Sequence, residues 1–307
     1  MTTNNTSPPI HPATKLRRII EDPNGFVFAP GVHDGLSARV ALASGFDVLY
    51  MTGAGTAASR LGQPDIALTT LPDMRAHAEM IASLSPTTPL IADMDTGFGG
   101  PSNVHRSVLE YIRAGVAGAH IEDQTQQKRC GHLSNKQLVS MDVFVSRIRA
   151  AVAARKSVGS DFVVIARTDA LAGEGGYEEA LRRLKGARGA GADVAFLEGV
   201  PDKETMGRVI RDLEGWPVLL NMVEYGRTPT VSVEEARALG FRVMIWPFAG
   251  IAPAMVAMKT AYKELKSTGL MKGQEKVTPK DLFGMCGLDE WVKVDMAAGG
   301  EDFRNGV

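Results

Sequence analysis

A short polar stretch of the chain holds the residue types best suited to chemistry. It reads Lys128-Arg129-Cys130-Gly131-His132 and contains one of only two cysteines. Because positive charge favours a thiolate, we expect the flanking cations to lower the pKa of the Cys130 thiol. The residues just before it are too hydrophilic for a core. The stretch predicts a flexible loop that carries a reactive cysteine over a carboxylate-rich pocket; the alternative is a surface loop with an incidental cysteine.

Two aspartates, Asp93 and Asp95, follow an apolar segment and precede a glycine-rich turn. Residues i and i+2 of an extended strand point the same way, so the two carboxylates should share one face. Asp65 and Glu122 can add further oxygens. An all-oxygen set suits Mg²⁺ or Mn²⁺, whereas Zn²⁺ prefers cysteine and histidine. The pattern predicts a site for a hard divalent cation. The alternative, that aspartates cap helices and turns, is weaker for four carboxylates than for one.

Arg167 closes an otherwise apolar segment and is followed two positions later by Asp169. A planar guanidinium can bind a carboxylate with two parallel hydrogen bonds, which makes Arg167 a candidate for binding a carboxylate substrate. The alternative is a structural ion pair with Asp169 or Glu198. The sequence leaves both interpretations open.

The elements that must position these residues form a repeating pattern. Eight apolar runs are continuous rather than alternating, as expected for parallel strands buried on both faces. Helical patterns separate them, which predicts an α/β protein with a (β/α)₈ TIM-type barrel. A doubly wound open sheet is the alternative, but no G-x-G-x-x-G fingerprint supports it. The apolar runs are 26–29, 48–51, 90–92, 118–121, 162–166, 194–197, 218–220 and 243–246, and the helical segments between them are 36–44, 71–84, 104–114, 141–156, 177–190, 203–213 and 233–239.

The pattern also divides the chain into parts. Residues 1–15 are polar and rich in proline, which predicts a disordered tail. The catalytic barrel is expected over 16–268, ending in a long helix after the eighth strand. Residues 269–307 are expected to form a linker and a helical extension that packs on this barrel or on a neighbouring subunit.

Composition excludes several classes of function. A net charge of −1 over 307 residues offers no electrostatic footprint for nucleic acid. No apolar run is long enough to span a membrane, and the amino-terminal residues do not form a secretory signal. Two cysteines make no disulfide framework, which predicts a reducing compartment, the cytoplasm. Lys15, Arg17 and Arg18 precede the first acidic residue, so a mitochondrial segment stays open.

Three motifs together resemble the isocitrate lyase/phosphoenolpyruvate mutase superfamily. They are Asp-x-Asp-Thr-Gly at 93–97, Gly-Ala-His-Ile-Glu-Asp at 118–123 and the 128–132 stretch, within a resemblance that covers 16–295. The resemblance implies a modified barrel, usually a homotetramer, with the eighth helix swapped between paired subunits. It implies Mg²⁺ (or Mn²⁺) as cofactor, bound directly by Asp93 and largely through water by Asp95, Glu122 and Asp65.

The resemblance also implies where a small di- or oxo-carboxylate substrate binds and which residues act on it. Cys130 matches a cysteine on a gating loop that protonates a carbanion-like intermediate. The implied catalytic set is Cys130, Lys128, His132, Arg167 and Glu122. The implied substrate contacts are Tyr50, Thr52, Gly53, Ala54, Asp93, His120, Gly131, Arg167, Glu198, Asn221 and Pro247.

The activity implied by the resemblance is a lyase that breaks a carbon–carbon bond of a 2-hydroxy dicarboxylate through an enolate. Mutase members lack the Cys-Gly-His segment, so Cys130 favours C–C cleavage. Three activities compete among the short members: 2,3-dimethylmalate lyase, oxaloacetate acetylhydrolase and 2-methylisocitrate lyase. A serine after the eighth strand resembles a marker of the hydrolases, and it aligns here with Pro247, which has no hydroxyl. This favours a lyase that releases pyruvate and a short carboxylate from a dimethylmalate-like substrate, with the oxaloacetate hydrolase as alternative.

Overall fold

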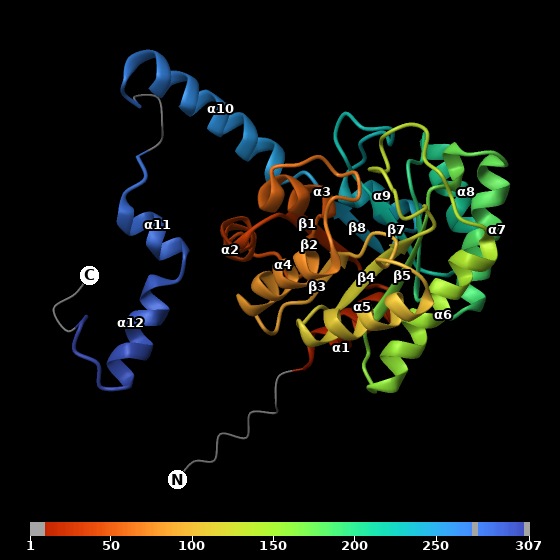
Figure 1. The fold of residues 1–307 in the computed structure, drawn as a ribbon, viewed down its shortest axis with the longest axis horizontal. Coiled ribbons are helices and arrows are strands. Elements are labelled where there is room, and N and C mark those ends of the chain that lie inside the picture. The colour runs from red at the N-terminus through yellow and green to blue at the C-terminus, as the bar shows by residue number, and fades with distance from the viewer. Residues whose placement is uncertain (1–9, 272–275, 304–307) are drawn as a thin grey trace, which may run out of the picture.

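The computed structural model describes residues 10–271 and 276–303. Within these residues, eight parallel strands pair in sequence order and close into a barrel (Figure 1). Each predicted apolar run overlaps one strand, which confirms the TIM-type barrel and excludes the open sheet. The strands are β1 (Val27–Val32), β2 (Leu49–Met51), β3 (Leu90–Asp93), β4 (Gly118–Glu122), β5 (Val163–Thr168), β6 (Val194–Leu197), β7 (Val218–Asn221) and β8 (Val243–Trp246).

The helices lie outside the barrel and follow the predicted segments closely. They are α1 (Pro12–Glu21), α2 (Gly35–Ala43), α3 (Gly53–Thr56), α4 (Leu71–Ser83), α5 (Pro101–Arg113), α6 (Met141–Ser157), α7 (Gly176–Gly189), α8 (Lys203–Asp212), α9 (Val233–Leu239), α10 (Ile251–Thr268), α11 (Pro279–Met285) and α12 (Leu288–Ala297). A π-helix, Ala57–Leu61, and a 3₁₀ turn, Ala170–Ala172, are additional. The sequence analysis did not identify α1 or the short elements after β2 and β5.

Helix α1 closes the amino-terminal end of the barrel. It begins at Pro12, so the predicted tail 1–15 extends too far, and residues 1–9 lie outside the described part of the chain. Ala13, Leu16 and Ile20 are buried and join the apolar cluster inside the barrel. Arg17 Nη1 lies 3.0 Å from Asp193 Oδ1. The basic residues that left a mitochondrial segment open therefore belong to a helix packed on the barrel.

The barrel interior is apolar at the amino-terminal end of the strands, which α1 closes, and polar at the carboxyl end. The inner cluster contains residues from every strand except β4, including Ala29, Ile91 and Phe196. A second and larger cluster fills the space between the strands and the surrounding helices. Because one end is sealed by apolar side chains, the polar residues gather at the carboxyl ends of the strands, where enzymes of this architecture hold their active sites.

Helix α10, the predicted helix after the eighth strand, extends away from its own barrel (Figure 1). Ala261 is its only buried residue among those described, and apolar residues such as Met255 and Tyr262 are exposed. Helix α11 lies beside α2, and the first turn of α12 meets it through Arg39 and Glu290, 3.6 Å apart; neither helix buries a residue within the described range. The predicted linker falls partly on 272–275, outside the described residues. No helix in the described ranges is long and apolar enough to cross a bilayer.

Candidate active site

The predicted site residues gather around one small cavity at the carboxyl ends of the strands. Its volume is about 30 Å³. Val223 and Phe248 also line it, and the sequence analysis missed both. Each lies two residues past the end of its strand, β7 or β8, so a wider window at the strand ends would have included them. The predicted residues that line the cavity are Tyr50, Thr52, Ala54, Asp65, Asp93, Cys130, Gly131, His132, Arg167, Glu198, Asn221 and Pro247.

The remaining predicted residues lie directly behind this lining. His120 Nδ1 is 3.7 Å from Asp93 Oδ1. A Cβ atom on residue 53 would overlap the Asp93 carboxylate, so a glycine is required there. Glu122, Asp95 and Lys128 are each paired with a residue of the lining or of the carboxylate cluster. The structure thus brings all the predicted site residues together.

The carboxylates of Asp93 and Asp95 lie in the same site because the chain turns after β3. They do not point the same way as alternate residues of one extended strand. Strand β3 ends at Asp93, and Asp95 adopts a left-handed backbone with φ of 47°. The Asp95 amide then donates to Asp93 Oδ1 over 2.8 Å. Burial raises the pKa of Asp93, and burial with repulsion from neighbouring carboxylates raises the pKa of Asp95 to about 6. The expectation that an extended strand aligns the two was wrong, although their proximity is real.

Lys128 supplies positive charge to this cluster. Its Nζ pairs with Asp65 and lies 2.5 Å from Asp95 Oδ1. Burial favours the neutral amine, but the surrounding carboxylates outweigh it and raise the pKa of Lys128 well above its usual range. Asp93 and Glu122 are left without a hydrogen bond from this ammonium. No three of the described acidic, histidine or cysteine side chains are arranged as ready ligands to a single metal ion.

Arg167 forms the structural ion pairs that one of the two interpretations predicted, and binding of a substrate carboxylate stays a prediction. Its Nε and Nη2 donate to Asp169 over 3.0 and 3.1 Å, and its Nη1 lies 3.1 Å from Glu122 Oε2. Its Nε is also 3.8 Å from Glu198 Oε2. The guanidinium therefore forms structural ion pairs, and it lines the cavity at the same time.

Tyr50, which lines the cavity, and His120 behind it form a neutral hydrogen-bonding pair. Tyr50 Oη lies 2.9 Å from His120 Nε2. Burial, with Arg167 nearby, lowers the pKa of His120 to about 3, and burial raises the pKa of Tyr50 well above its usual value. Both groups are uncharged near neutral pH, so they can orient an oxygen of a ligand without adding charge.

A loop between residues 124 and 138 covers the cavity. Gln124 and Leu138 form an antiparallel bridge at its base. Within the loop, the amide of Cys130 donates to the Asp65 carbonyl over 3.1 Å, which ties it to the loop after β2. His132 Nε2 lies 3.5 Å from Glu198 Oε1, and Asn221 donates to the other Glu198 oxygen over 3.0 Å. The loop is held closed over the strand ends.

The expected lowering of the Cys130 pKa was wrong. Burial raises the pKa of the thiol, because water no longer stabilises a thiolate. The nearby cations offset this only weakly. Lys128 is paired with carboxylates, Arg129 is exposed and donates to the Ser134 carbonyl, and burial lowers the pKa of His132. Cys130 is therefore a protonated thiol at neutral pH, suited to donate a proton rather than to attack as a nucleophile.

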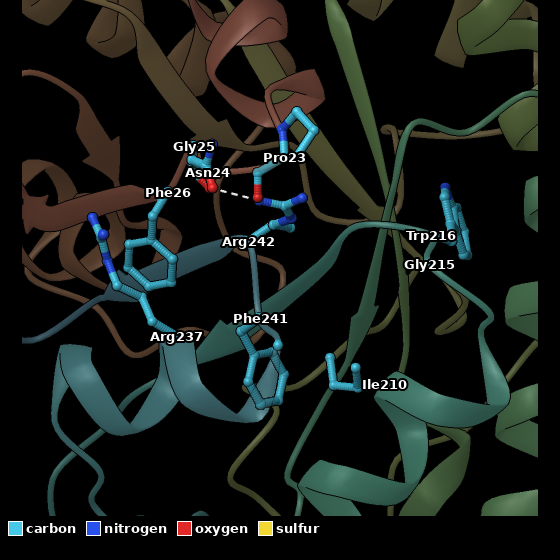
Figure 2. A pocket seen from close by; sticks show the side chains of 11 residues that line it. Pro23, Asn24, Gly25, Phe26, Ile210, Gly215, Trp216, Arg237, Phe241 and Arg242 are labelled. Atoms are coloured by element: carbon cyan, nitrogen blue, oxygen red, sulfur yellow. Dashed lines mark hydrogen bonds between the residues drawn. The ribbon is translucent and has the colours of Figure 1, made fainter.

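A second cavity, of about 400 Å³, opens at the amino-terminal end of β1, β7 and β8 (Figure 2). Arg242 is committed to the chain itself, because its Nη1 donates to the carbonyls of Asp22 and Gly25 over 3.1 Å. Arg237 lies 4.6 Å from the centre of the Phe26 ring. The described residues around this cavity include no acid, thiol or imidazole. This cavity is larger than the one at the carboxyl ends of the strands, but among the described residues its lining holds no group suited to acid–base or nucleophilic catalysis.

Comparison with known proteins gives one consistent result. The family model described as phosphoenolpyruvate phosphomutase matches residues 16–266. The 2,3-dimethylmalate lyase of Eubacterium barkeri is 41% identical over 285 residues, which cover 92% of this chain and 96% of that protein. A crystal structure of a 2,3-dimethylmalate lyase, described as a PEP mutase/isocitrate lyase superfamily member, superposes with a TM-score of 0.95 at 58% identity, covering 98% and 99% of the two chains.

Other solved structures carry bound ligands. An oxaloacetate acetylhydrolase in complex with the inhibitor 3,3-difluorooxalacetate has a TM-score of 0.94 at 53% identity, and the match covers 97% of this chain and 100% of that chain. A phosphonopyruvate hydrolase in complex with oxalate and Mg²⁺ has a TM-score of 0.83 at 27% identity, with coverage of 94% and 99%.

Proposed function

Because the chain belongs to the phosphoenolpyruvate mutase/isocitrate lyase superfamily, we propose that it is a carbon–carbon lyase that cleaves a 2,3-dimethylmalate-like 2-hydroxy dicarboxylate into pyruvate and a short carboxylate. The observation that carries the proposal is the Cys130 thiol, which stays protonated and faces the same cavity as Asp93 and Arg167. A proton donor above a carboxylate-rich cluster is what enolate-forming cleavage requires.

Mg²⁺ or Mn²⁺ is the proposed cofactor, held by Asp93, Asp95, Glu122 and Asp65. These side chains offer only oxygen atoms, which hard divalent cations prefer. The buried oxygen Glu122 Oε2 accepts no hydrogen bond within the described residues, but it lies 3.1 Å from Arg167 Nη1, so a cation or its water would share this oxygen with the guanidinium. When bound, the ion would polarise the 2-oxygen of the substrate and stabilise negative charge that develops there.

The remaining steps are substrate orientation, proton transfer and exclusion of water, and each is proposed for side chains of the protein. Asn221 and the Tyr50–His120 pair orient substrate oxygens, while Arg167 places positive charge beside a substrate carboxylate. A carboxylate of the cluster accepts the hydroxyl proton, the C2–C3 bond breaks, and its electrons form the enolate of the leaving carboxylate. Cys130 protonates the carbon of that enolate. The closed 124–138 loop excludes water during this step.

Oxaloacetate acetylhydrolase activity is the second candidate, because one of the structures most similar to this chain is such a hydrolase. Pro247 argues against it, since it lines the cavity and has no hydroxyl for a hydrated oxaloacetate. A 2-methylisocitrate lyase is the third candidate, and the volume of the closed cavity does not distinguish its substrate from dimethylmalate.

A product assay tests the choice. Oxaloacetate, (2R,3S)-2,3-dimethylmalate and 2-methylisocitrate are offered in parallel with Mg²⁺ or Mn²⁺. We expect pyruvate and propionate from dimethylmalate, with no product after chelation by EDTA and recovery when excess metal is restored. Oxalate and acetate from oxaloacetate would support the hydrolase instead, and pyruvate with succinate would support the methylisocitrate lyase. Activity unchanged by chelation would refute the cation site.

We also propose that the chain assembles as a homotetramer in which α10 is exchanged between paired subunits. An apolar groove of about 560 Å³ lies between α2 and the start of α10, with Leu36, Val40 and Met258 in its lining. The described residues of one chain cover neither this groove nor the exposed face of α10. The two unpaired cysteines agree with a reducing compartment, and the cytoplasm is the proposed location.

Light scattering coupled to size exclusion checks the assembly. The protein is expected to elute with four times the mass of one chain, and Tyr262→Glu on the exposed face of α10 should shift it toward smaller species, because a charge is placed in an apolar contact. Lys185→Glu, on the exposed surface of α7, serves as the control and should leave the mass unchanged. A monomer at micromolar concentration would contradict the exchange.

A further inference from the structure

The loop over the cavity contains a buried lysine that the proposed chemistry does not use. Lys136 lies near the carboxyl end of the loop, and its side chain is only 5% exposed. Its Nζ donates to two acceptors, the Gly131 carbonyl over 2.6 Å and Asp169 Oδ1 over 2.7 Å. The first acceptor belongs to the loop itself and the second to the chain just after β5.

The Gly131 side of this bridge sets the position of the reactive thiol. A Cβ atom on residue 131 would lie 2.5 Å from Arg167 Nη2 and 2.6 Å from Glu198 Cδ, so the loop backbone touches the cavity wall there. Cys130 is the adjacent residue. Fixing the Gly131 carbonyl therefore fixes the distance of the Cys130 thiol from the strand ends.

The Asp169 side of the bridge is part of the rigid barrel. The Asp169 amide donates to Asp123 Oδ1 over 2.9 Å, and its carboxylate accepts both bonds from Arg167. Arg167 is shared with Glu122, so it does not serve Asp169 alone. In the closed loop, Lys136 is thus a second cation beside this buried carboxylate.

We propose that Lys136 is the latch of the 124–138 loop, a positioning residue that holds Cys130 over the cavity by joining the Gly131 carbonyl to Asp169. Lys128, Cys130 and His132 also hold the loop, but they belong to the site itself. Two further bonds lie nearer the surface: Gln126 accepts from Thr96 over 2.9 Å, and Ser134 accepts from Arg227 over 3.2 Å. The catalytic consequence rests on the proposed function, because it takes Cys130 as the proton donor. The mechanical part does not, and it can be measured without substrate.

The reactivity of Cys130 toward iodoacetamide reports how often the loop opens. Cys286 is exposed and would also react, so the full chain carries Cys286→Ser throughout. Removal of the two charge-assisted hydrogen bonds in Lys136→Met is expected to raise the alkylation rate of Cys130 by about ten- to a hundredfold. Lys136→Arg keeps the charge, so its alkylation rate should lie between the rates of the parent protein and of Lys136→Met. Lys185→Met, an exposed lysine on α7, is the matched control with an unchanged rate.

Kinetics provide the second readout. If Lys136 positions the thiol, Lys136→Met lowers kcat more than it raises KM, because the substrate contacts stay in place. An alkylation rate equal to that of the parent protein in folded Lys136→Met would overturn the latch; should that variant misfold, Lys136→Gln is measured in its place under the same criterion. Faster alkylation in a protein with no lyase activity would keep the latch and reject the proposed function, so the two failures are distinguishable.

Discussion

Replacement of Cys130 by serine is expected to lower kcat on the true substrate by about a hundred- to ten-thousandfold, the usual contribution of a positioned general acid. A serine hydroxyl is nearly isosteric but is a much weaker acid than a thiol. KM should change little, because the ligand contacts proposed for Asp93, Arg167 and Asn221 do not involve the thiol. Steady-state formation of pyruvate from dimethylmalate measures both constants. Unchanged turnover in Cys130→Ser would exclude this residue as the proton donor.

The pH dependence gives the same residue a second test. Burial raises the pKa of the Cys130 thiol above the ordinary value of 9.0, so the acid form that donates the proton is present at neutral pH and is lost only as pH rises through the raised pKa. The alkaline decrease in kcat/KM that belongs to Cys130 should therefore fall above pH 9 and be absent in the serine variant. A thiol with a lowered pKa would instead lose activity near neutral pH.

The fold could be predicted because its main signal is local. Eight continuous apolar runs separated by helical patterns specify buried parallel strands whatever their order in space. Helix α1 was missed although its signal was present, with Pro12 at the first helical position and buried residues at 13, 16 and 20. That spacing is helical, but a polar, proline-rich beginning concealed it.

The gathering of the candidate residues around one cavity could be predicted for a similar reason. In a parallel barrel, the residue after each strand is carried to the same end, so reading the strand ends collects the site without knowledge of contacts. The electrostatics could not be read this way. Lys128 is two positions from Cys130 in sequence, yet its ammonium serves Asp65, 63 positions away. The prediction treated neighbours of Cys130 in sequence as neighbours of its thiol in space. Burial, which the sequence does not show, decided the direction in which the pKa of Cys130 shifts.

Arg167→Met is expected to lower the free energy of unfolding by about 3 to 5 kcal/mol, the usual cost of leaving buried charges without their partner. The change removes the cation that faces Asp169, Glu122 and Glu198, all of which are almost completely buried. For a barrel of this size, Tm should fall by roughly 10 °C. Scanning calorimetry of the two proteins measures the difference, and activity is expected to be lost with it.

The pH dependence of the Tm difference between the parent protein and Arg167→Met shows whether unpaired carboxylates cause the loss of stability. Burial disfavours the ionised form of Asp169, but Arg167 and Lys136 outweigh it and lower its pKa in the folded protein. A lowered pKa contributes stability that is present above the unfolded value and is lost as pH falls. Without Arg167 the buried carboxylates can fold only by taking up protons, so the Tm difference should be largest near pH 8 and should narrow toward pH 5.

Two further variants separate charge from packing at this position. Glu122→Gln introduced into Arg167→Met should recover part of the lost stability, since it removes one of the unpaired charges. Arg182→Met, an exposed arginine that pairs with Glu179 on α7, is the matched control and should leave Tm almost unchanged. If Arg167→Met loses activity with an unchanged Tm, the guanidinium acts on the substrate alone and the ion pairs do not stabilise the barrel. Equal Tm differences at pH 8 and pH 5 would assign the loss to packing of the long side chain rather than to the unpaired carboxylates.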